Sequence, residues 1–317
     1  MDTKVVITID TESDNLWDSG LRKNPRFNNI FEIPRLQKIF DKYSVKPTYL
    51  ITFSVAKNDA AGVLKEIARS RKCEIGSHLH SWETPPFERQ ARGDGTYLHQ
   101  YPYKVQREKF SNLDSVLKNV FGDKPVSYRG GRYSFDKNII SILAEYGYLV
   151  DTSVTPGISW ENDGGVNFKK FGRKDHVIKT QGSGILEVPV SIKIKSLLPQ
   201  ISKAVYLNTP NWTHAEGMLR RLAKFDIIWL DPSFNEYGKM RWACDSLLSE
   251  GVRHLNIMFH SSVIIPGGSP YTMDKASTDK FFENIERLLE YVVRSKKLEV
   301  LTLKEFHGYR SNRTGSL

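Results

Sequence analysis

The sequence has no apolar run that approaches the roughly 18 residues needed to cross a bilayer. It contains only two cysteines, Cys73 and Cys244, and neither belongs to a CxxC pair, which argues against a disulfide framework or a cysteine-rich metal domain. The first residues lack the basic, apolar and small-residue regions of a signal peptide. We therefore expect a cytoplasmic protein with two reduced, mostly buried thiols.

Several signatures of common function classes are also missing. A net charge of +10 could attract nucleic acid, anionic lipid or an acidic glycan, but zinc-finger spacing, RNA-recognition motifs and basic helices followed by heptads are absent. The glycines at 182 and 184 have no Lys-Ser/Thr tail to form a phosphate loop, and no G-x-S-x-G elbow surrounds Ser261. We therefore expect no nucleic acid partner and no serine-hydrolase chemistry.

Segments of strand character alternate with segments of helical periodicity along the chain. Strands are expected at 5–9, 48–52, 74–80, 126–128, 149–153, 185–190, 227–230, 255–259 and 298–303, and helices at 31–40, 60–69, 105–121, 136–146, 212–225, 241–248 and 281–293. This alternation predicts an α/β fold with a mainly parallel sheet or barrel. A single domain over 1–317 is expected, with loop insertions at 83–104, interpreted as a substrate lid, and at 155–184, which could hold a hairpin and receives no chemistry.

Functional side chains gather where two of these strands end. His78 and His80 stand two residues apart, so both imidazoles point to one face of a strand and can converge on one ion. Asp10 and Glu12 repeat this spacing after the first strand. Parallel sheets carry their chemistry at the carboxyl ends of strands, so we expect the two strand ends to be neighbours.

The other predicted strand ends add Arg129, Arg132, Asp151, Asp231 and His260. Two histidines and one carboxylate suit a zinc-like ion that activates water, a second carboxylate can act as general base, and a separate histidine can act as general acid. This set predicts a mononuclear metal hydrolase with one divalent ion. Zinc suits the ligands best, although cobalt, nickel or iron would fit them too.

Five ordered segments carry the strand-end groups: Thr8-Ile9-Asp10-Thr11-Glu12, Ser77-His78-Leu79-His80-Ser81-Trp82 with Thr84-Pro85-Pro86, Tyr128-Arg129-Gly130-Gly131-Arg132-Tyr133, Asp151-Thr152-Ser153 and Phe259-His260-Ser261. Together they resemble the metal-dependent polysaccharide deacetylases of the nodulation-protein type, closest to the branch associated with lipopolysaccharide biosynthesis. The resemblance covers roughly residues 3 to 305. It implies a distorted, TIM-barrel-like (β/α) barrel, a divalent metal and removal of an N-acetyl group from an amino sugar.

Matched residue by residue, the resemblance implies roles for the strand-end groups. Asp10 becomes the base, Glu12 a metal ligand, His260 the acid and Arg129 the partner that orients the base. Substrate contacts are expected from Trp82, Arg132, Tyr133 and Asp151. Asp231 and Glu187 are weaker candidates for a role in the site. The remaining histidines expected at the surface are His176, His214, His254 and His307.

Two positions depart from the family pattern. The family's second metal histidine usually stands four residues after the first, where this chain has Trp82, and Glu12 replaces the more usual aspartate. These departures leave the ligand set open between His78 with His80 and a set in which Asp14 or His99 substitutes.

The predicted function is therefore metal-dependent N-deacetylation of a glycan or lipid-linked sugar in surface polysaccharide or lipopolysaccharide biosynthesis. The alternatives are a hydrolase of a small non-sugar amide and a non-catalytic glycan-binding relative. The basic charge further predicts peripheral contact with the anionic inner face of the membrane. The clusters expected to make it are 169–174, 220–224, 296–297 and Lys193 with Lys195, the last pair flanked by Ile192, Ile194, Leu197 and Leu198.

Overall fold

A computed structural model describes residues 2–87, 91–180, 184–209 and 215–314 of the chain. The strands of this part are β1 (Lys4–Thr11), β2 (Thr48–Ile51), β3 (Glu74–Leu79), β4 (Ser127–Gly130), β5 (Val150–Asp151), β6 (His176–Lys179), β7 (Gly184–Glu187), β8 (Ile192–Lys195), β9 (Asp226–Trp229) and β10 (His254–His260). The α-helices are α1 (Ser19–Lys23), α2 (Asn28–Lys42), α3 (Phe53–Lys57), α4 (Ala61–Arg69), α5 (Tyr103–Phe121), α6 (Lys137–Glu145), α7 (Pro199–Asn208), α8 (Ala215–Ala223), α9 (Tyr237–Ser249), α10 (Lys275–Leu289) and α11 (Leu303–Thr314). Short 3-10 turns occupy Leu98–Gln100, Gly131–Tyr133, Glu161–Asp163 and Ser261–Ile264, and a π-helical segment, Glu290–Ser295, follows α10.

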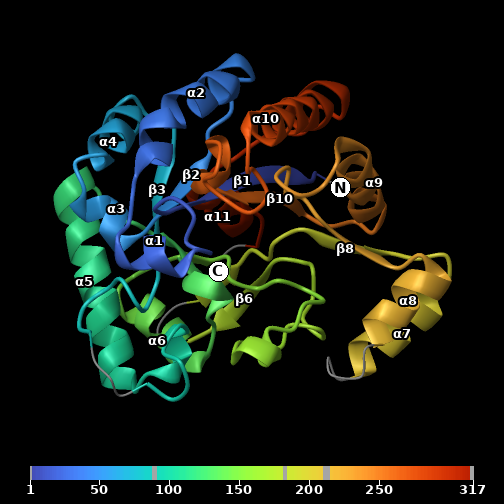
Figure 1. The fold of residues 1–317 in the computed structure, drawn as a ribbon, viewed down its shortest axis with the longest axis horizontal. Coiled ribbons are helices and arrows are strands. Elements are labelled where there is room, and N and C mark those ends of the chain that lie inside the picture. The colour runs from blue at the N-terminus through green and yellow to red at the C-terminus, as the bar shows by residue number, and fades with distance from the viewer. Residues whose placement is uncertain (1, 88–90, 181–183, 210–214, 315–317) are drawn as a thin grey trace.

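Eight strands form one curled sheet in the order β10-β1-β2-β3-β4-β5-β7-β6. Every pair in this sheet is parallel except β6 with β7, which form an antiparallel pair. In Figure 1 the helices α2, α4, α5 and α6 follow one another around the sheet, α10 and α9 continue the ring, and α7 and α8 lie apart from it at the lower right. The fold is therefore an α/β half-barrel of mixed but mainly parallel strands, as the distorted barrel prediction requires.

Single backbone hydrogen bonds, rather than a full ladder, bridge the open side of the barrel. Met258 of β10 donates to the carbonyl of Leu230 (3.0 Å), Leu230 donates to Ser191 (3.0 Å), and Val190 donates to Val154 (3.0 Å). β8 and β9 pair only with each other, as a separate antiparallel sheet. The strands are thus too irregular here to close a complete barrel.

The alternation of β1 shows how the barrel interior is built. Val5, Ile7 and Ile9 point outward and belong to the main apolar cluster under the helices, whereas Val6 points inward and packs with residues of α11. Thr8 follows on the inner face, donating to Asn256 Oδ1 (2.8 Å), and Asp10 is next. Because side chains alternate along a strand, the interior changes from an apolar floor to a polar layer and then to ionisable groups at the carboxyl end.

Most of the predicted helices and strands are confirmed within a few residues, but the closing strand at 298–303 is wrong. Val300 makes only an isolated bridge to Val5, and a helix begins at Leu303. Thr302 and Glu305 cap each other: Thr302 N donates to Glu305 Oε2 (2.9 Å) and Glu305 N to Thr302 Oγ1 (3.2 Å). This T-x-x-E capping box is a helix-start signal that the apolar alternation masked.

The second long segment supplies β6, which pairs antiparallel with β7, the strand predicted separately at 185–190, so only one strand of this pair lies wholly within 155–184. β7 ends at Glu187, so Pro189 stands beyond the strand, which explains why the strand is shorter than the predicted 185–190. Helix α8 covers 215–223 of the helix predicted at 212–225, whose first residues lie outside the described part of the chain. β8, α1, α3 and α7 were not predicted.

Among the histidines expected at the surface, His254 is buried: its side chain is 1% exposed, and its Nε2 lies 2.9 Å from the carbonyl of Pro189. Burial lowers the pKa of His254 to about 4. His176 is exposed as expected, His307 is half-buried, and His214 lies outside the described residues. Cys73 and Cys244 are free thiols. None of the helices described is long and apolar enough to cross a membrane.

Candidate active site

One cavity of about 570 Å³ collects the side chains from the carboxyl ends of β1, β3 and β10. Asp10 lies on β1, His78 on β3 and His260 on β10, whereas Glu12 and His80 directly follow β1 and β3. β1 pairs directly with β10, and their register sets Asp10 beside His260. β2 stands between β1 and β3, so the two strand ends are not adjacent as predicted. Their side chains meet because the sheet curls around them.

Glu12, His78 and His80 offer one ligand atom each within 4.8 Å of one another. Glu12 Oε2 lies 3.4 Å from His80 Nε2 and 3.9 Å from His78 Nε2. A tetrahedral zinc ion with bonds of about 2.0–2.2 Å separates its ligands by roughly 3.3–3.6 Å. The three atoms therefore form a possible metal site with the donor types and the approximate spacing that such an ion needs.

Each histidine has an oxygen atom near its other ring nitrogen. His78 Nδ1 lies 3.0 Å from the carbonyl of Arg129, and His80 Nδ1 lies 3.3 Å from Glu83 Oε1. Ser54 donates to the other oxygen of Glu83 (2.6 Å). An acceptor at Nδ1 favours the tautomer whose Nε2 lone pair is free for a metal. Sequence reasoning missed Glu83, although its place three residues after His80 was a usable signal.

The carboxyl groups of Asp10, Glu12 and Glu83 lie close together, and the described cations around them do not balance their full negative charge. Burial, with Asp10 and Glu83 nearby, raises the pKa of Glu12 well above its usual value. Burial alone would also raise the pKa of Glu83, but His80 holds it below the usual value. A cation between Glu12 and the two imidazoles would stabilise the ionised carboxylate, which fits the donor set to a divalent metal.

Asp10 is held by a buried guanidinium. Arg129, fully buried, donates to Asp10 Oδ1 (2.5 Å), to Thr8 Oγ1 (2.7 Å) and to the carbonyl of Thr152 (2.9 Å). Burial by itself would raise the pKa of Asp10, but the charge of Arg129 holds it below its usual value. The other oxygen of Asp10 is 3.7 Å from His78 Nε2, so an ionised carboxylate faces the possible metal position.

His260 stands on the opposite side of Asp10 and lines the cavity. Its Nε2 is 3.8 Å from Asp10 Oδ2, and its ring meets Trp17 edge-on at 5.2 Å. Desolvation lowers the pKa of His260 to about 4, although Asp10 opposes this shift. The imidazole is therefore neutral at pH 7 in the free protein.

Asp231, a weak candidate in the sequence, also lines the cavity and is only 2% exposed. Ser233 donates to its Oδ1 from both its backbone N–H (2.8 Å) and its hydroxyl (2.6 Å). Burial raises the pKa of Asp231 to about 7. It is thus a carboxyl group that exchanges a proton near neutral pH within the same cavity.

Three of the expected substrate-contacting residues line the cavity: Trp82, Arg132 and Tyr133. Trp82 stacks on the His80 ring at 4.2 Å. Arg132 and Tyr133 both have left-handed backbones, with φ of 52° and 59°, conformations that cost L-residues energy and cluster at functional sites. The turn after β4 therefore holds these two residues in an unfavourable backbone conformation, with both side chains at the cavity.

The fourth expected contact, Asp151, is not at the cavity. It is fully buried and accepts a hydrogen bond from Ser153 (2.6 Å). Burial raises the pKa values of both Asp151 and Glu187, which adjoin each other beside the carbonyl that accepts from Arg129. Strand-end position and the family resemblance both suggested Asp151, but Val150 of β5 packs in the inner apolar cluster, so the next residue, Asp151, faces away from the barrel interior, level with Tyr128 of the outer cluster.

The substitute ligands are occupied elsewhere. Asp14 accepts hydrogen bonds from the backbone N–H groups of Asn28 (3.1 Å) and Asn29 (3.0 Å) at the start of α2. His99 lies beside Ser134 Oγ (2.9 Å) and the carbonyl of Gly164 (3.2 Å). Neither residue lines the cavity.

The two long insertions contribute differently from what we expected. Among the described residues of 83–104, none lines the cavity, but Thr96 accepts a hydrogen bond from Arg132 (2.5 Å) at its rim. The segment 155–184, to which no chemistry was assigned, supplies Trp160 and Asp163 to the cavity wall. The lid interpretation of 83–104 stays a prediction.

A family model described as "Polysaccharide deacetylase" matches residues 25–150. This segment includes His78, His80 and Arg129, but not Asp10, Glu12 or His260, and it covers less than half of the chain. No curated protein matches the sequence. Over residues 25–150 the chain is therefore similar to the polysaccharide deacetylases.

Solved structures resemble the whole fold at low identity. A Mycobacterium smegmatis protein provisionally described as a polysaccharide deacetylase is 16% identical with a TM-score of 0.53, covering 95% of this chain and 94% of its own. The PuuE allantoinase is 12% identical with a TM-score of 0.60, covering 99% and 91%. The 4-alpha-glucanotransferase of Thermococcus litoralis is 11% identical with a TM-score of 0.56, covering 96% and 40%. Such different activities on one fold mean that this likeness bears on architecture, and the chemistry must be argued from the site.

Proposed function

We propose that this protein is a metal-dependent carbohydrate N-deacetylase of the polysaccharide deacetylase family. The observation that carries the proposal is the cluster of Glu12, His78 and His80 beside the Asp10–Arg129 pair, with His260 across the same cavity. A carbohydrate hydrolase of this kind needs a metal position, an ionised base and a separate acid within reach of one bond.

In the proposed reaction, water adds to the acetamide carbonyl, the C–N bond breaks, and acetate and a free sugar amine are released. A divalent ion bound by Glu12, His78 and His80 supplies Lewis acidity for the carbonyl and the attacking water. Asp10 takes the proton of the water, and Arg129 keeps the carboxylate ionised and oriented. His260 donates a proton to the departing nitrogen.

The low pKa of His260 imposes an order on these proton transfers. Since desolvation keeps this imidazole neutral at pH 7, it cannot enter the reaction as a resting imidazolium. It takes up the proton that Asp10 has received from the water, because Asp10 Oδ2 lies 3.8 Å from His260 Nε2, and passes this proton to the departing nitrogen. The proposal therefore expects activity that does not fall on the alkaline side through a histidine pKa near 6.5.

The metal is proposed to be zinc, because two imidazoles and one carboxylate suit it, with cobalt, nickel or iron as fitting replacements. Elemental analysis should find one ion per chain, lost in both His78→Ala and His80→Ala proteins. His99→Ala is the matched control, because this imidazole lies outside the cavity. Metal loss in His99→Ala with full retention in His80→Ala would refute the ligand set.

The substrate is proposed to be an N-acetylated glycan or lipid-linked sugar in surface polysaccharide or lipopolysaccharide biosynthesis. The aromatic rim of Trp82, Tyr133 and Trp160 suits the apolar faces of sugar rings. The test is acetate release from N-acetyl-sugar glycans, lipid-linked sugars and nucleotide sugars, with and without chelator. Release from simple amides alone would favour the small-amide hydrolase, and sugar binding without release from any substrate would favour a non-catalytic relative.

A cytoplasmic protein working on lipid-linked sugars would benefit from membrane contact, and the α7–α8 pair supports such contact. Leu197, Leu198, Ile201, Met218 and Leu222 are each more than half exposed on this pair or just before it. The exposed Lys195, Lys203, Arg221 and Lys224 surround them. Apolar side chains among cations are the composition of a surface that enters the headgroup region of an anionic bilayer.

The structure changes which residues this contact would use. Ile192, expected to flank the basic cluster at the surface, is only 1% exposed and belongs to the core. Lys193 is paired with Glu250, and Lys169 is buried. The proposed contact surface is therefore the outer side of α7–α8, near Leu198 and Leu222.

Co-sedimentation with anionic and neutral vesicles across a salt series tests the membrane contact. Wild-type protein should pellet with anionic vesicles at low salt, and Leu198→Ser with Leu222→Ser should weaken this binding. Phe31→Ser is the matched control, because Phe31 is 58% exposed on α2, outside the proposed contact surface. Equal recovery with both vesicle types would reject the membrane role and leave an acidic ligand as the reason for the basic charge.

A further inference from the structure

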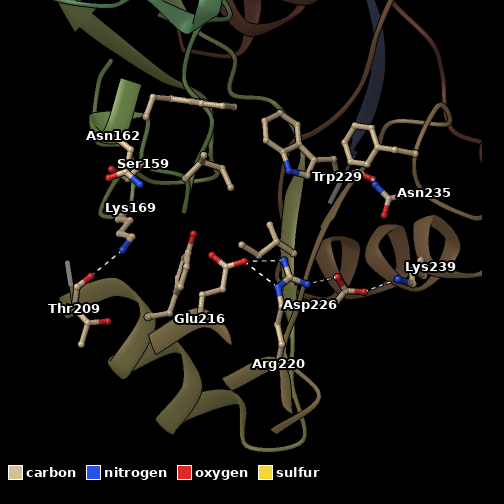
Figure 2. A pocket seen from close by; sticks show the side chains of 15 residues that line it. Ser159, Asn162, Lys169, Thr209, Glu216, Arg220, Asp226, Trp229, Asn235 and Lys239 are labelled. Carbon is tan, nitrogen blue, oxygen red and sulfur yellow. Dashed lines mark hydrogen bonds and ion pairs between the residues drawn. The ribbon is translucent and has the colours of Figure 1, made fainter. Parts of the chain in front are cut away.

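A second cavity of about 570 Å³, here called the outer cavity, lies next to the active-site cavity. Its lining comes from residues 158–239, beyond the segment that matches the family model. Trp160, Trp229 and Phe234 line both cavities, so they form a shared wall along which one extended ligand can run. Figure 2 shows the outer cavity between the side chains of β9, α8 and the loop around Ser159.

The walls of the outer cavity suit a sugar. Trp160 and Trp229 meet at 6.4 Å with their planes 65° apart, and Trp160 also stacks on Tyr133 of the active-site rim at 5.4 Å. Asn162 and Ser159 add polar side chains to the lining. An apolar wall with a few polar groups is the usual composition of small-ligand sites, and indole faces accept the C–H faces of sugar rings.

Most of the charge in the outer cavity is balanced within a row of ion pairs. Arg220 binds Glu216 (2.7 Å) and approaches Asp226 (3.5 Å), and Lys239 binds the other oxygen of Asp226 (2.7 Å). The dashed lines of Figure 2 follow this row. Two carboxylates and two cations leave it without net charge, so it can orient hydroxyl groups but does not select for an anion.

Lys169 also lines the outer cavity but takes no part in this row of ion pairs. Its side chain lines the cavity and is nearly buried at 6% exposure. Its Nζ donates to the carbonyl of Thr209 (2.9 Å) and lies 4.6 Å from the centre of the Tyr206 ring, and no carboxylate of the described residues forms an ion pair with it. Burial lowers the pKa of Lys169, although the more distant carboxylates of Glu161 and Glu216 oppose this shift. A buried cation without an anion at a cavity wall attracts one.

We propose that the outer cavity binds an anionic group of the same glycan whose N-acetyl group is hydrolysed next door, with Lys169 as its charge partner. The inference rests on the proposed function for the identity of the glycan, but the binding itself does not depend on turnover. The anion is a carboxylate of a sugar acid or a phosphate on the sugar chain, and both present the same oxygen acceptors to an ammonium group. The substrate is therefore an acidic molecule of at least two units, not a neutral monosaccharide.

Calorimetric binding to Asp10→Asn protein, which should not turn substrate over, tests the proposal. The ligands are a neutral N-acetylated oligosaccharide, the same oligosaccharide with a C6 carboxylate on one sugar, and its C6 phosphate ester. The acidic forms should bind more tightly than the neutral one. Combining Lys169→Met with Asp10→Asn should weaken the binding of the acidic forms about tenfold or more, as expected for loss of a charge-assisted hydrogen bond. The affinity for the neutral ligand should not change.

Two further variants separate an effect on binding from an effect on folding. Lys170→Met removes an exposed charge at the next residue, outside the cavity lining, and should change the affinities by less than about threefold because solvent and salt screen it. Asn162→Asp adds a negative charge at an exposed lining position that should tolerate it, and should weaken the acidic ligands selectively even if Lys169→Met protein does not fold.

The possible outcomes distinguish a failure of the anion-site proposal from a failure of the deacetylase proposal. Equal affinity for neutral and acidic ligands, or an unchanged preference in Asn162→Asp, would overturn the assignment of an anion site. If the wild-type protein releases acetate but shows no preference for acidic ligands, the anion site in the outer cavity is refuted and the deacetylase proposal is kept. Selective acidic binding without acetate release from any ligand would keep the outer cavity and refute the deacetylase. The preferred acidic form identifies the source of the anion.

Discussion

The buried pair of Arg129 and Asp10 offers the sharpest test of the site, because its removal should affect stability and pH dependence together. Arg129→Met keeps a long apolar side chain but deletes the guanidinium. In the wild-type protein that group donates to Asp10, to Thr8 and to the carbonyl of Thr152. In the variant these acceptors stay buried, and the carboxylate of Asp10 loses its cation.

Breaking a buried ion pair by removing one partner costs about 3–5 kcal/mol, because the remaining charge is uncompensated. Total stabilities are typically about 5–15 kcal/mol, so this cost is a large part of the whole. Asp10→Asn combined with Arg129→Met removes both charges and should cost less than the sum of the single changes. The coupling energy should be about 2 kcal/mol or more, given that Arg129 is fully buried and Asp10 is 2% exposed.

The sign of the pH effect follows from the pKa of Asp10. The lowered folded-state pKa means that its contribution to stability is present above the unfolded value near 3.9 and is lost as the pH falls through the folded value. Without Arg129, burial raises this pKa instead. Protonation then neutralises Asp10 as the pH falls, so the stability gap between the variant and the wild type should narrow.

Urea unfolding of the wild-type, single and double variants, with chelator present and at pH values from 7 down to 5, measures the gap. We expect about 3–5 kcal/mol at pH 7 and a clearly smaller difference at pH 5. Arg129→Lys is the matched control, since it keeps the charge and loses the forked donor geometry. A gap below about 1 kcal/mol at pH 7, the size of an exposed pair, or a gap that does not change with pH, would refute the reasoning.

Three further predictions concern single residues. His254 has a folded-state pKa of about 4 against the usual 6.5, so it opposes folding increasingly as the pH falls from 6.5 to 4, by up to about 3 kcal/mol. His254→Gln protein should therefore lose less unfolding free energy over this pH range than the wild type. Equal losses in the two proteins would contradict this. Glu83→Gln should weaken zinc binding about 10- to 100-fold in a chelator competition, because it removes the carboxylate beside His80 Nδ1, and unchanged affinity would count against that role. Gly131→Ala would place a Cβ 2.4 Å from the His80 ring and 2.4 Å from the carbonyl of Leu79, so it should lower both metal occupancy and melting temperature, and full occupancy at the wild-type melting temperature would show that the turn adapts.

Local sequence patterns were sufficient for most of the helices and strands and for their chemistry-bearing ends. Alternation in β1 and the i, i+2 spacing of His78 and His80 depend only on backbone periodicity, so they survive folding unchanged. The helix at 303–314 was missed because an apolar alternation outweighed the capping box of Thr302 and Glu305. Where two local signals compete, contacts elsewhere in the fold decide between them.

The composition of the site depended on contacts between distant segments. Glu83 is a local exception, because it follows His80 by three residues, whereas Asp231 reaches the cavity from the end of β9, on the irregular side of the barrel. Asp151 carries the same strand-end signal as Asp10, yet it is buried away from the cavity. Both residues stand at strand ends, but Asp10 follows Thr8 on the inner face of β1, whereas Asp151 lies level with Tyr128 of the outer cluster.

The sequence by itself determined the residue types at the strand ends, and with them a metal hydrolase chemistry, because strand periodicity aligns side chains without reference to the rest of the chain. Only the tertiary structure decided which of these groups meet. β2 separates β1 from β3, and the curl of the sheet brings Glu12 to 3.4 Å from His80 across it. It also decided that Lys169, one of many lysines in the sequence, is a buried cation at a cavity wall. Curvature and burial are sums over contacts between distant residues, and no local pattern contains them.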